Sequence, residues 1–253
     1  MEWNLVAETL ETETFQHLAP PLQVAILLGA LSFIVSLLVS VTAFTRIIIV
    51  LSFVRRALTT QEIPPNPVIM GLALFLTLFV MAPTFQAIHT NAVKPYLADQ
   101  GDEEKAIEEK VSLEEAFNIA CDELKVFMLH NTRETDLLLF MDMAKRSEQP
   151  VAASPGAEPL DEAELTYEEY KQVPLTTLVP AFIISELKTA FIMGFCIYIP
   201  FLLIDLVVST VLMSLGMMMM PPVVVATPCK LLLFVMVDGW QLIAQALVTS
   251  FGG

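Results

Sequence analysis

Charged side chains are missing from three long stretches of this chain. No Asp, Glu, Lys or Arg occurs between positions 13 and 46, between 62 and 94, or between 205 and 230. Charged residues make up 16% of the chain and hydrophobic residues 55%, whereas a typical soluble domain is about 25% charged. Apolar runs of about 18 residues or more are typical of membrane-spanning helices. The sequence therefore excludes an ordinary soluble domain and predicts an all-α membrane protein.

Signatures of catalysis are also missing. The chain contains no Walker A loop, no HExxH or GxSxG motif and no dinucleotide-binding fingerprint. Its three cysteines and three histidines are scattered, and none of them forms a CxxC pair or a Cys/His cluster with metal-ligand spacing. We therefore expect no enzyme activity, no metal site and no cofactor.

Basic residues are scarce, and the net charge is −15. Residues 94–171 contain 20 acidic and 8 basic side chains, so most of the negative charge belongs to this one stretch. Nucleic-acid binding needs a basic surface, so nucleic acid is excluded as a partner. The simplest interpretation of the acidic stretch is that its charge keeps an extramembrane insert soluble.

The chain is predicted to fold as two long kinked helical hairpins that flank a small helical periplasmic insert. Residues 1–20 form a polar N-terminal tail, which we expect to precede a retained membrane helix instead of acting as a cleavable signal. The first hairpin covers 21–93 and the helical insert 94–148. An acidic linker rich in Pro, Ala and Ser follows at 149–171 and is predicted to be disordered. The second hairpin covers 172–253 and contains a Met-rich loop.

Each hairpin consists of a long helix, a diproline loop and a second helix. In the first hairpin we expect helices over 21–54 and 68–93, with a kink at Pro83. In the second we expect helices over 179–216 and 223–251. Consecutive prolines cannot continue a helix, so each pair marks the tip of a hairpin.

The insert carries its own helix signals. Ser112 and Glu115 match a capping box, and a second short helix is expected over 134–146. Apolar residues then recur at helical spacing after the box: Leu113, Phe117, Ala120, Leu124, Phe127 and Met128.

Orientation follows from the few basic residues near the loops. Arg46, Arg55 and Arg56 lie near the first diproline loop, and Lys230 lies near the second. Because cytoplasmic loops of membrane proteins are enriched in Lys and Arg, both hairpin tips are predicted to face the cytoplasm. The N-terminus, the insert and the C-terminus would then face the periplasm.

Six charges lie inside the apolar segments, three of each sign: Arg46, Lys188, Lys230, Glu186, Asp205 and Asp238. An ionised side chain at bilayer depth is costly and is normally paired. One interpretation is that these charges hold helices together, and the other is that some line a hydrated pathway or a proton relay. Glu186 and Lys188 are two residues apart and should face different sides of their helix. We expect Glu186 to pair with Lys230 of a neighbouring copy.

Four consecutive methionines follow Gly216: Met217, Met218, Met219 and Met220. Methionine is unbranched and deformable, so the run could simply fill gaps between helices. A ring of such side chains from several copies would instead make an apolar constriction that blocks ions yet yields to a passing chain.

Several longer motifs of the chain are distinctive. They are the runs from Phe44 to Val50, Pro64 to Asn66, Gly71 to Thr77, Thr132 to Asp136, Ser185 to Phe191, Ile199 to Asp205, Gly216 to Pro222, and Asp238 to Trp240. These motifs resemble the FliP family of flagellar export-gate proteins. Together they extend the resemblance over residues 22–148 and 173–251.

The resemblance implies a multi-pass protein of the bacterial inner membrane, within the flagellar basal body. In that family several copies assemble with FliQ- and FliR-like subunits into a channel for unfolded flagellar proteins, and the Met-rich loop acts as a pore gasket. The equivalent gate subunit of a virulence injectisome remains an alternative. A third is an ion-coupled solute transporter, which would need a binding site at broken helices near the membrane midplane.

Overall fold

The computed structural model describes residues 20–58, 64–98, 112–148, 173–217 and 221–252. These residues form helices and turns, and no strand occurs among them, which confirms the all-α prediction. The chain divides into two compact units, residues 1–40 and 41–253. The predicted polar tail and acidic linker fall outside the described residues, apart from Pro20 at the end of the tail.

The described part of the first unit is a single apolar helix, α3 (Pro20–Ser40), whose described side chains are mostly exposed. The helix expected over 21–54, which at that length must tilt, kink or project beyond a bilayer, is interrupted by a turn at residues 41–43 that separates α3 from α4 (Phe44–Ala57). At this turn the hydroxyl of Thr42 accepts a hydrogen bond from the Phe44 N–H at 3.4 Å. Threonine hydroxyls compete in this way with the helical hydrogen bonds of the backbone.

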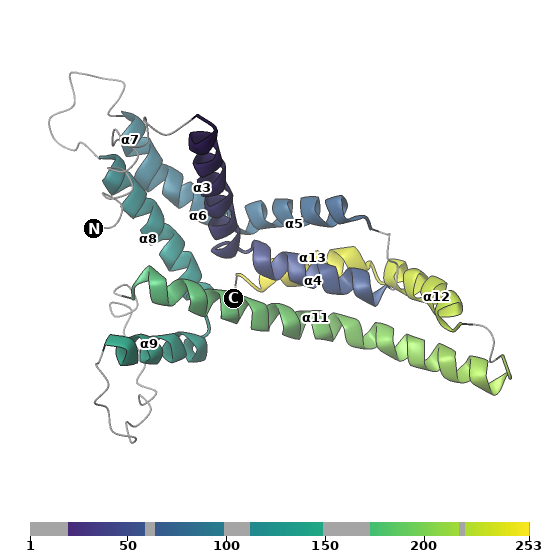
Figure 1. The fold of residues 1–253 in the computed structure, drawn as a ribbon. Helices are drawn as coiled ribbons and strands as arrows, with labels where there is room; N and C mark the ends of the chain where they lie inside the picture. Colours follow the sequence, from purple (N-terminus) through teal and green to yellow (C-terminus); the bar gives the residue numbers. More distant parts are fainter. Residues whose placement is uncertain (1–19, 59–63, 99–111, 149–172, 218–220, 253) are drawn as a thin grey trace. The chain divides into compact units, whose positions relative to one another are not determined.

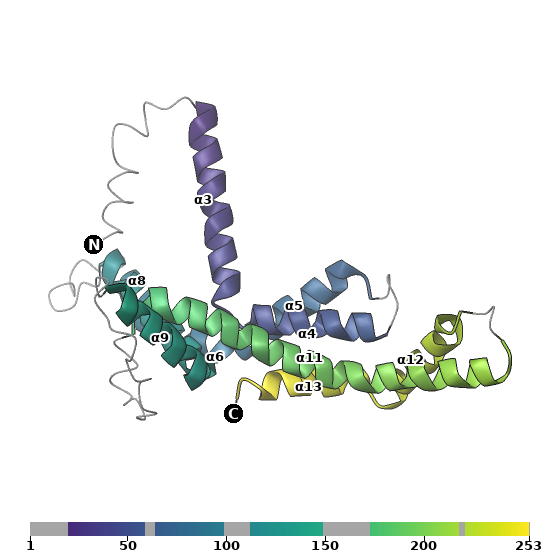
Figure 2. The same cartoon turned by 60° about the horizontal axis from the view of Figure 1, so that its bottom comes forward.

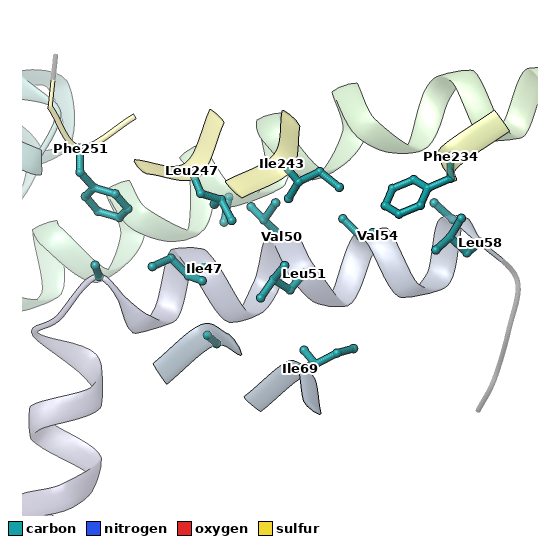
Figure 3. Close-up of a cluster of buried hydrophobic side chains, with 14 of the residues drawn as sticks. Ile47, Val50, Leu51, Val54, Leu58, Ile69, Phe234, Ile243, Leu247 and Phe251 are labelled. Atoms are coloured by element: carbon teal, nitrogen blue, oxygen red, sulfur yellow. The ribbon is translucent and has the colours of Figure 1, made fainter. Parts of the chain in front are cut away.

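The core of the second unit forms around α4. Helices α5 (Asn66–Val80), α11 (Leu175–Ser214) and α13 (Gly239–Thr249) lie alongside it (Figures 1 and 2). The buried residues of α4 recur at helical spacing, which is the pattern of an amphipathic helix that packs on one face. Figure 3 shows this face meeting side chains of α5, α12 (Val223–Met236) and α13. The labelled side chains are Ile47, Val50, Leu51, Val54, Leu58, Ile69, Phe234, Ile243, Leu247 and Phe251.

The second helix of the first hairpin is bent, as predicted. Helix α5 and the helix that follows it meet at an angle of 57°. Pro83 lies in the first turn of α6 (Ala82–Ile88), where its missing N–H has no helical partner to lose. A π-helix, η1 (His89–Val93), and α7 (Lys94–Ala98) continue from α6.

The second helix of the second hairpin is broken, so the expectation of one helix over 223–251 is wrong. Helices α12 and α13 meet at 63°. Asp238 separates them in the left-handed conformation, with φ of 51°. A right-handed helix cannot pass through a residue held in that conformation.

Helix α11 is unbroken over 40 residues and contains Pro180 and Pro200. At 1.5 Å per residue it is about 60 Å long, twice the roughly 30 Å of a bilayer's hydrocarbon core. It is the one described helix that is long and apolar enough by itself to cross a membrane. The bent pairs α5 with α6–α7, and α12 with α13, raise the number of candidate spans to three.

Helices α8 (Leu113–Asn131) and α9 (Glu134–Glu148) pack against the N-terminal part of α11 (Figure 1). The capping box at Ser112 and Glu115 is confirmed, with both reciprocal hydrogen bonds present. The predicted apolar stripe is only partly buried. Leu113 and Phe117 are exposed, whereas Met128 is buried.

Candidate functional site in the buried charges

Arg46 and Glu186 form a buried ion pair between α4 and α11. Their side chains are 3% and 0% exposed. Arg46 Nε donates to Glu186 Oε2 at 2.7 Å, and Nη2 donates to Oε1. The pairing is therefore bidentate, which is the strongest geometry available to a guanidinium and a carboxylate.

The rest of the Arg46 guanidinium binds the end of α13. Its Nη1 donates to the Ser250 carbonyl oxygen at 2.9 Å and to the Ser250 hydroxyl at 3.0 Å. Its central carbon lies 3.8 Å from the centre of the Phe251 ring, a cation–π contact. Carbonyls at a helix C-terminus lack helical partners and favour cations. Arg46 thereby fastens three helices at one point.

Ser185, next to Glu186, binds the turn between α8 and α9. Its buried hydroxyl accepts a hydrogen bond from the Arg133 N–H at 2.9 Å. Two adjacent residues of α11 thus hold α4 and the α8–α9 turn. Sequence reasoning missed Ser185 and Ser250 as site residues, because a serine in an apolar helix does not reveal its partner. The runs around Ser185 and Arg133 drew notice only through the family resemblance.

Lys230 forms a second buried centre of charge. Its Nζ donates to Asp205 Oδ2 at 2.5 Å and to the Ala57 carbonyl oxygen at 3.1 Å. Lys230 is 1% exposed, and Asp205 is 37% exposed. Ala57 is the last residue of α4, so this lysine joins α12, α11 and the C-terminal end of α4.

The expected pairing of Glu186 with Lys230 of another copy rests on a wrong premise. Both side chains have partners of opposite charge within the chain, Arg46 and Asp205. The start of α4 meets Glu186 of α11 through Arg46, whereas the end of α4 meets Lys230 of α12, which pairs in turn with Asp205 of α11. The sequence shows which charges need partners but not which helices are neighbours.

The other two charges of the apolar segments are exposed. Lys188 lies on a different face of α11 from Glu186, as predicted, and Asp238 lies at the break between α12 and α13. Neither side chain forms a hydrogen bond or an ion pair with another residue in the described ranges. The chain therefore brings together four of the six charges and leaves these two on its surface.

The methionine run begins where α11 ends. Gly216 adopts φ of 76°, a conformation that favours glycine, and it reverses the chain after Ser214. Met217 follows and is exposed, while residues 218–220 lie outside the described ranges.

In this arrangement each positive side chain pairs with one negative side chain, so that each pair carries no net charge. Glu186 and Asp205 are 19 positions apart on α11, about 28 Å along a helix. The two ion pairs are therefore separate: one holds the start of α4, and the lysine of the other donates a hydrogen bond to the end of α4. Among the described residues no three His, Cys, Asp or Glu side chains are grouped to hold a metal ion.

The fold and the buried charges define an all-helical protein in which α11 is by itself long and apolar enough to cross a membrane, and two bent helix pairs are further candidate spans. The model of the FliP family matches residues 27–247. The chain is 48% identical over 236 residues to "Flagellar biosynthetic protein FliP" of Bacillus subtilis (strain 168), covering 93% of this chain and 94% of that protein.

Proteins of the same name in other bacteria are also similar. The identity is 46% over 229 residues for Pectobacterium carotovorum subsp. carotovorum, covering 90% of this chain and 78% of that protein. It is 39% over 235 residues for Aquifex aeolicus (strain VF5), covering 93% and 87%. The chain belongs to the FliP family, which confirms the resemblance of its motifs.

Proposed function

We propose that this chain is a channel-forming subunit of the flagellar protein-export gate in the bacterial inner membrane. Several copies assemble with FliQ- and FliR-like subunits and pass unfolded flagellar proteins across the membrane. The family match over residues 27–247 carries this proposal. The relatives' names refer to flagellar biosynthesis, which favours the flagellar gate over an injectisome.

The exposed surface supports assembly with lipid or other subunits. Large apolar side chains are exposed along α5, α11 and α12, among them Phe75, Phe195 and Met236. Exposed apolar surface on this scale needs a lipid or protein partner. The proposed periplasmic side of the insert rests on the placement of basic residues near the loops.

The bonded pair of helices α4 and α11 supports a role for the run Met217 to Met220 as the pore gasket. The Arg46–Glu186 ion pair holds the start of α4 to α11, and Lys230, which is paired with Asp205 of α11, donates a hydrogen bond to the last residue of α4. In the sequence, the methionine run lies between α11 and α12. Deformable apolar methionine side chains next to a firmly packed helix suit a constriction that must close around different chains.

The test replaces all four methionines, Met217 to Met220, with glycine in one variant and with leucine in a matched control. The glycine variant should assemble but leak ions and small solutes, because it removes the apolar volume of the constriction. The leucine variant keeps that volume and should stay closed. Membrane permeability of cells expressing each assembled gate is the measurement. An assembled glycine variant with unchanged permeability would count against the gasket.

The partners are tested by purification. The tagged chain, extracted in mild detergent, should bring down FliQ- and FliR-like subunits together with further copies of itself. Isolation of the chain alone, active in solute uptake, would favour a transporter instead.

A further inference from the structure

A groove runs along the surface between α4 and α11. It has a volume of about 250 Å³ and opens to the outside of the chain. Five of its lining residues come from α4 and one from α11: Ile48, Ile49, Ser52, Phe53, Arg56 and Phe191.

The wall of the groove is fixed by aromatic packing. Phe53 meets Phe191 edge-on, with ring centres 5.6 Å apart and planes at 80°. Behind Phe53 lies Gly194, where an added Cβ would come within 2.5 Å of the Phe53 ring. The glycine therefore provides the space in which the Phe53 ring sits, and the groove is a built feature of this helix pair.

The interior of the groove offers no free hydrogen-bond donor. Ser52, the one hydroxyl residue in the lining, donates its proton to the Ile48 carbonyl at 2.7 Å. The remaining interior residues are isoleucine and phenylalanine. A polar ligand would lose its hydration here without compensation, so an occupant of the interior must be apolar.

Charge is confined to one end of the groove. Arg56 is the only charged residue of the lining, and its side chain is exposed. Its neighbour Arg55 donates to the side-chain oxygen of Asn66 and does not line the groove. An exposed guanidinium binds phosphate oxygens through two parallel hydrogen bonds. The groove thus combines an apolar trough with a phosphate-binding cation at its end.

We propose that this groove binds an anionic phospholipid, with part of one acyl chain against Ile49 and Phe191 and the phosphate on Arg56. An apolar tail joined to an anionic head matches both features of the groove at once. Basic pockets between membrane helices bind anionic headgroups in the same manner. The proposal rests on the proposed membrane location but not on protein export, and it assigns the groove to lipid instead of to a helix of another subunit.

The first experiment identifies what touches the groove. The photo-crosslinking residue p-benzoylphenylalanine replaces Phe191 in the full chain, and the assembled complex is irradiated in native membranes. Mass spectrometry should find phospholipid adducts in which phosphatidylglycerol exceeds its share of the bulk membrane. Adducts mainly to a protein chain would overturn the proposal, because they would show that another subunit covers the groove.

The second experiment tests the cation. Purified complexes carrying Arg56→Gln or the matched control Arg55→Gln are placed in phosphatidylcholine nanodiscs with a titrated fraction of phosphatidylglycerol. Loss of one basic residue near an anionic headgroup should weaken phosphatidylglycerol retention about fivefold. The Arg55 control should retain it like the unmodified complex.

Equal losses in both variants would overturn the proposal, because they would indicate diffuse attraction to the membrane surface. Unchanged retention in the Arg56 variant would overturn it as well. Both experiments measure lipid and not secretion, so their failure would leave the export function untouched. Conversely, a complex that binds the lipid at Arg56 but exports nothing would contradict only the proposed function.

Discussion

At the scale of single residues, the most demanding group is the Arg46 guanidinium. The carboxylate, the carbonyl and the aromatic ring that it contacts belong to residues at least 140 positions away in the chain. A buried cation is tolerated only when its partners are in place, and removing one partner of a buried ion pair typically costs about 3–5 kcal/mol. The buried environment also allows the ion pair to be replaced with two apolar side chains of similar volume, because apolar side chains need no partner to offset a cost of desolvation.

Glu186→Ala should therefore lower the free energy of unfolding by about 3–5 kcal/mol, and Arg46→Met should lower it by a similar amount. The double variant Arg46→Met/Glu186→Met should be more stable than either single variant. Lys188→Ala, at an exposed position on the same helix, is the control and should change little. Thermal unfolding of the detergent-purified protein measures all four. Single variants as stable as the unmodified protein would show that the pair is not needed.

At the scale of helices, the contact between α4 and α11 depends on one small residue. Gly194 faces the Phe53 ring so closely that no side chain fits between them. The Phe53 ring also meets Phe191 and Phe195, with centres 5.6 and 5.7 Å away. The ring cannot move without disturbing these two neighbours, so the helix spacing is set by the glycine.

Gly194→Ala should destabilise the protein by about 1–3 kcal/mol, the usual cost of overpacking. A second substitution, Phe53→Leu, removes the ring that collides and should restore part of the loss. Gly71→Ala is the matched control, because nothing lies within 4 Å of a Cβ at that glycine of α5. The measurement is the unfolding temperature of the unmodified protein, the two Gly194→Ala proteins with and without Phe53→Leu, and the Gly71→Ala control. Equal effects at both glycines would point to helix propensity instead of packing.

The break between α12 and α13 makes a separate prediction at this scale. Asp238 has φ of 51°, a conformation that glycine adopts without strain and β-branched residues rarely adopt. Asp238→Gly should keep the stability of the protein, whereas Asp238→Val should lower it by about 1–3 kcal/mol. Both variants remove the same carboxylate, so a difference between them in thermal unfolding reports the backbone alone. Equal losses would mean that the carboxylate itself is required.

At the scale of the whole molecule, helices α8 and α9 offer a way to measure orientation. Cys121 lies in α8 and is half-buried. Burial, with a smaller contribution from the neighbouring Asp122, raises the pKa of the Cys121 thiol above its ordinary value. The other two described cysteines, Cys196 and Cys229, lie in α11 and α12 and can be replaced with serine.

In this single-cysteine protein, a membrane-impermeant maleimide should label Cys121 from the periplasmic side only. Because the reactive form is the thiolate, labelling should accelerate about tenfold per pH unit until the raised pKa is passed. Asp122→Asn removes the nearby negative charge and should speed labelling at neutral pH. Spheroplasts and inverted vesicles expose opposite faces of the membrane, and their comparison is the measurement. Labelling in inverted vesicles alone would reverse the proposed orientation.

Much of the helical content could be predicted from the sequence, because charge-free runs, prolines and the Ser112 capping box act locally. The turn at 41–43 could not be predicted, because the apolar pattern continues there and only the backbone conformation changes. The break at Asp238 carries a local signal, since Asp-Gly is a dipeptide typical of turns, but such a dipeptide does not by itself show that a helix breaks. The partners of Arg46 and Lys230 were equally out of reach, since apolar helices carry little information about which face meets which neighbour. Charge balance indicated that partners exist, and the packing of α4 against α11 decided which ones.

The partners of Arg46 are synthesised long after Arg46 itself. Glu186 is 140 positions further along the chain and Ser250 is 204. At about 5–20 residues per second, the ribosome adds Glu186 about 7–28 s after Arg46, and the serine follows later. During that interval α4 carries a cation without its carboxylate, which favours a position at the membrane surface. A nascent chain that stops before Glu186 therefore keeps Arg46 without the carboxylate that neutralises it in the folded protein.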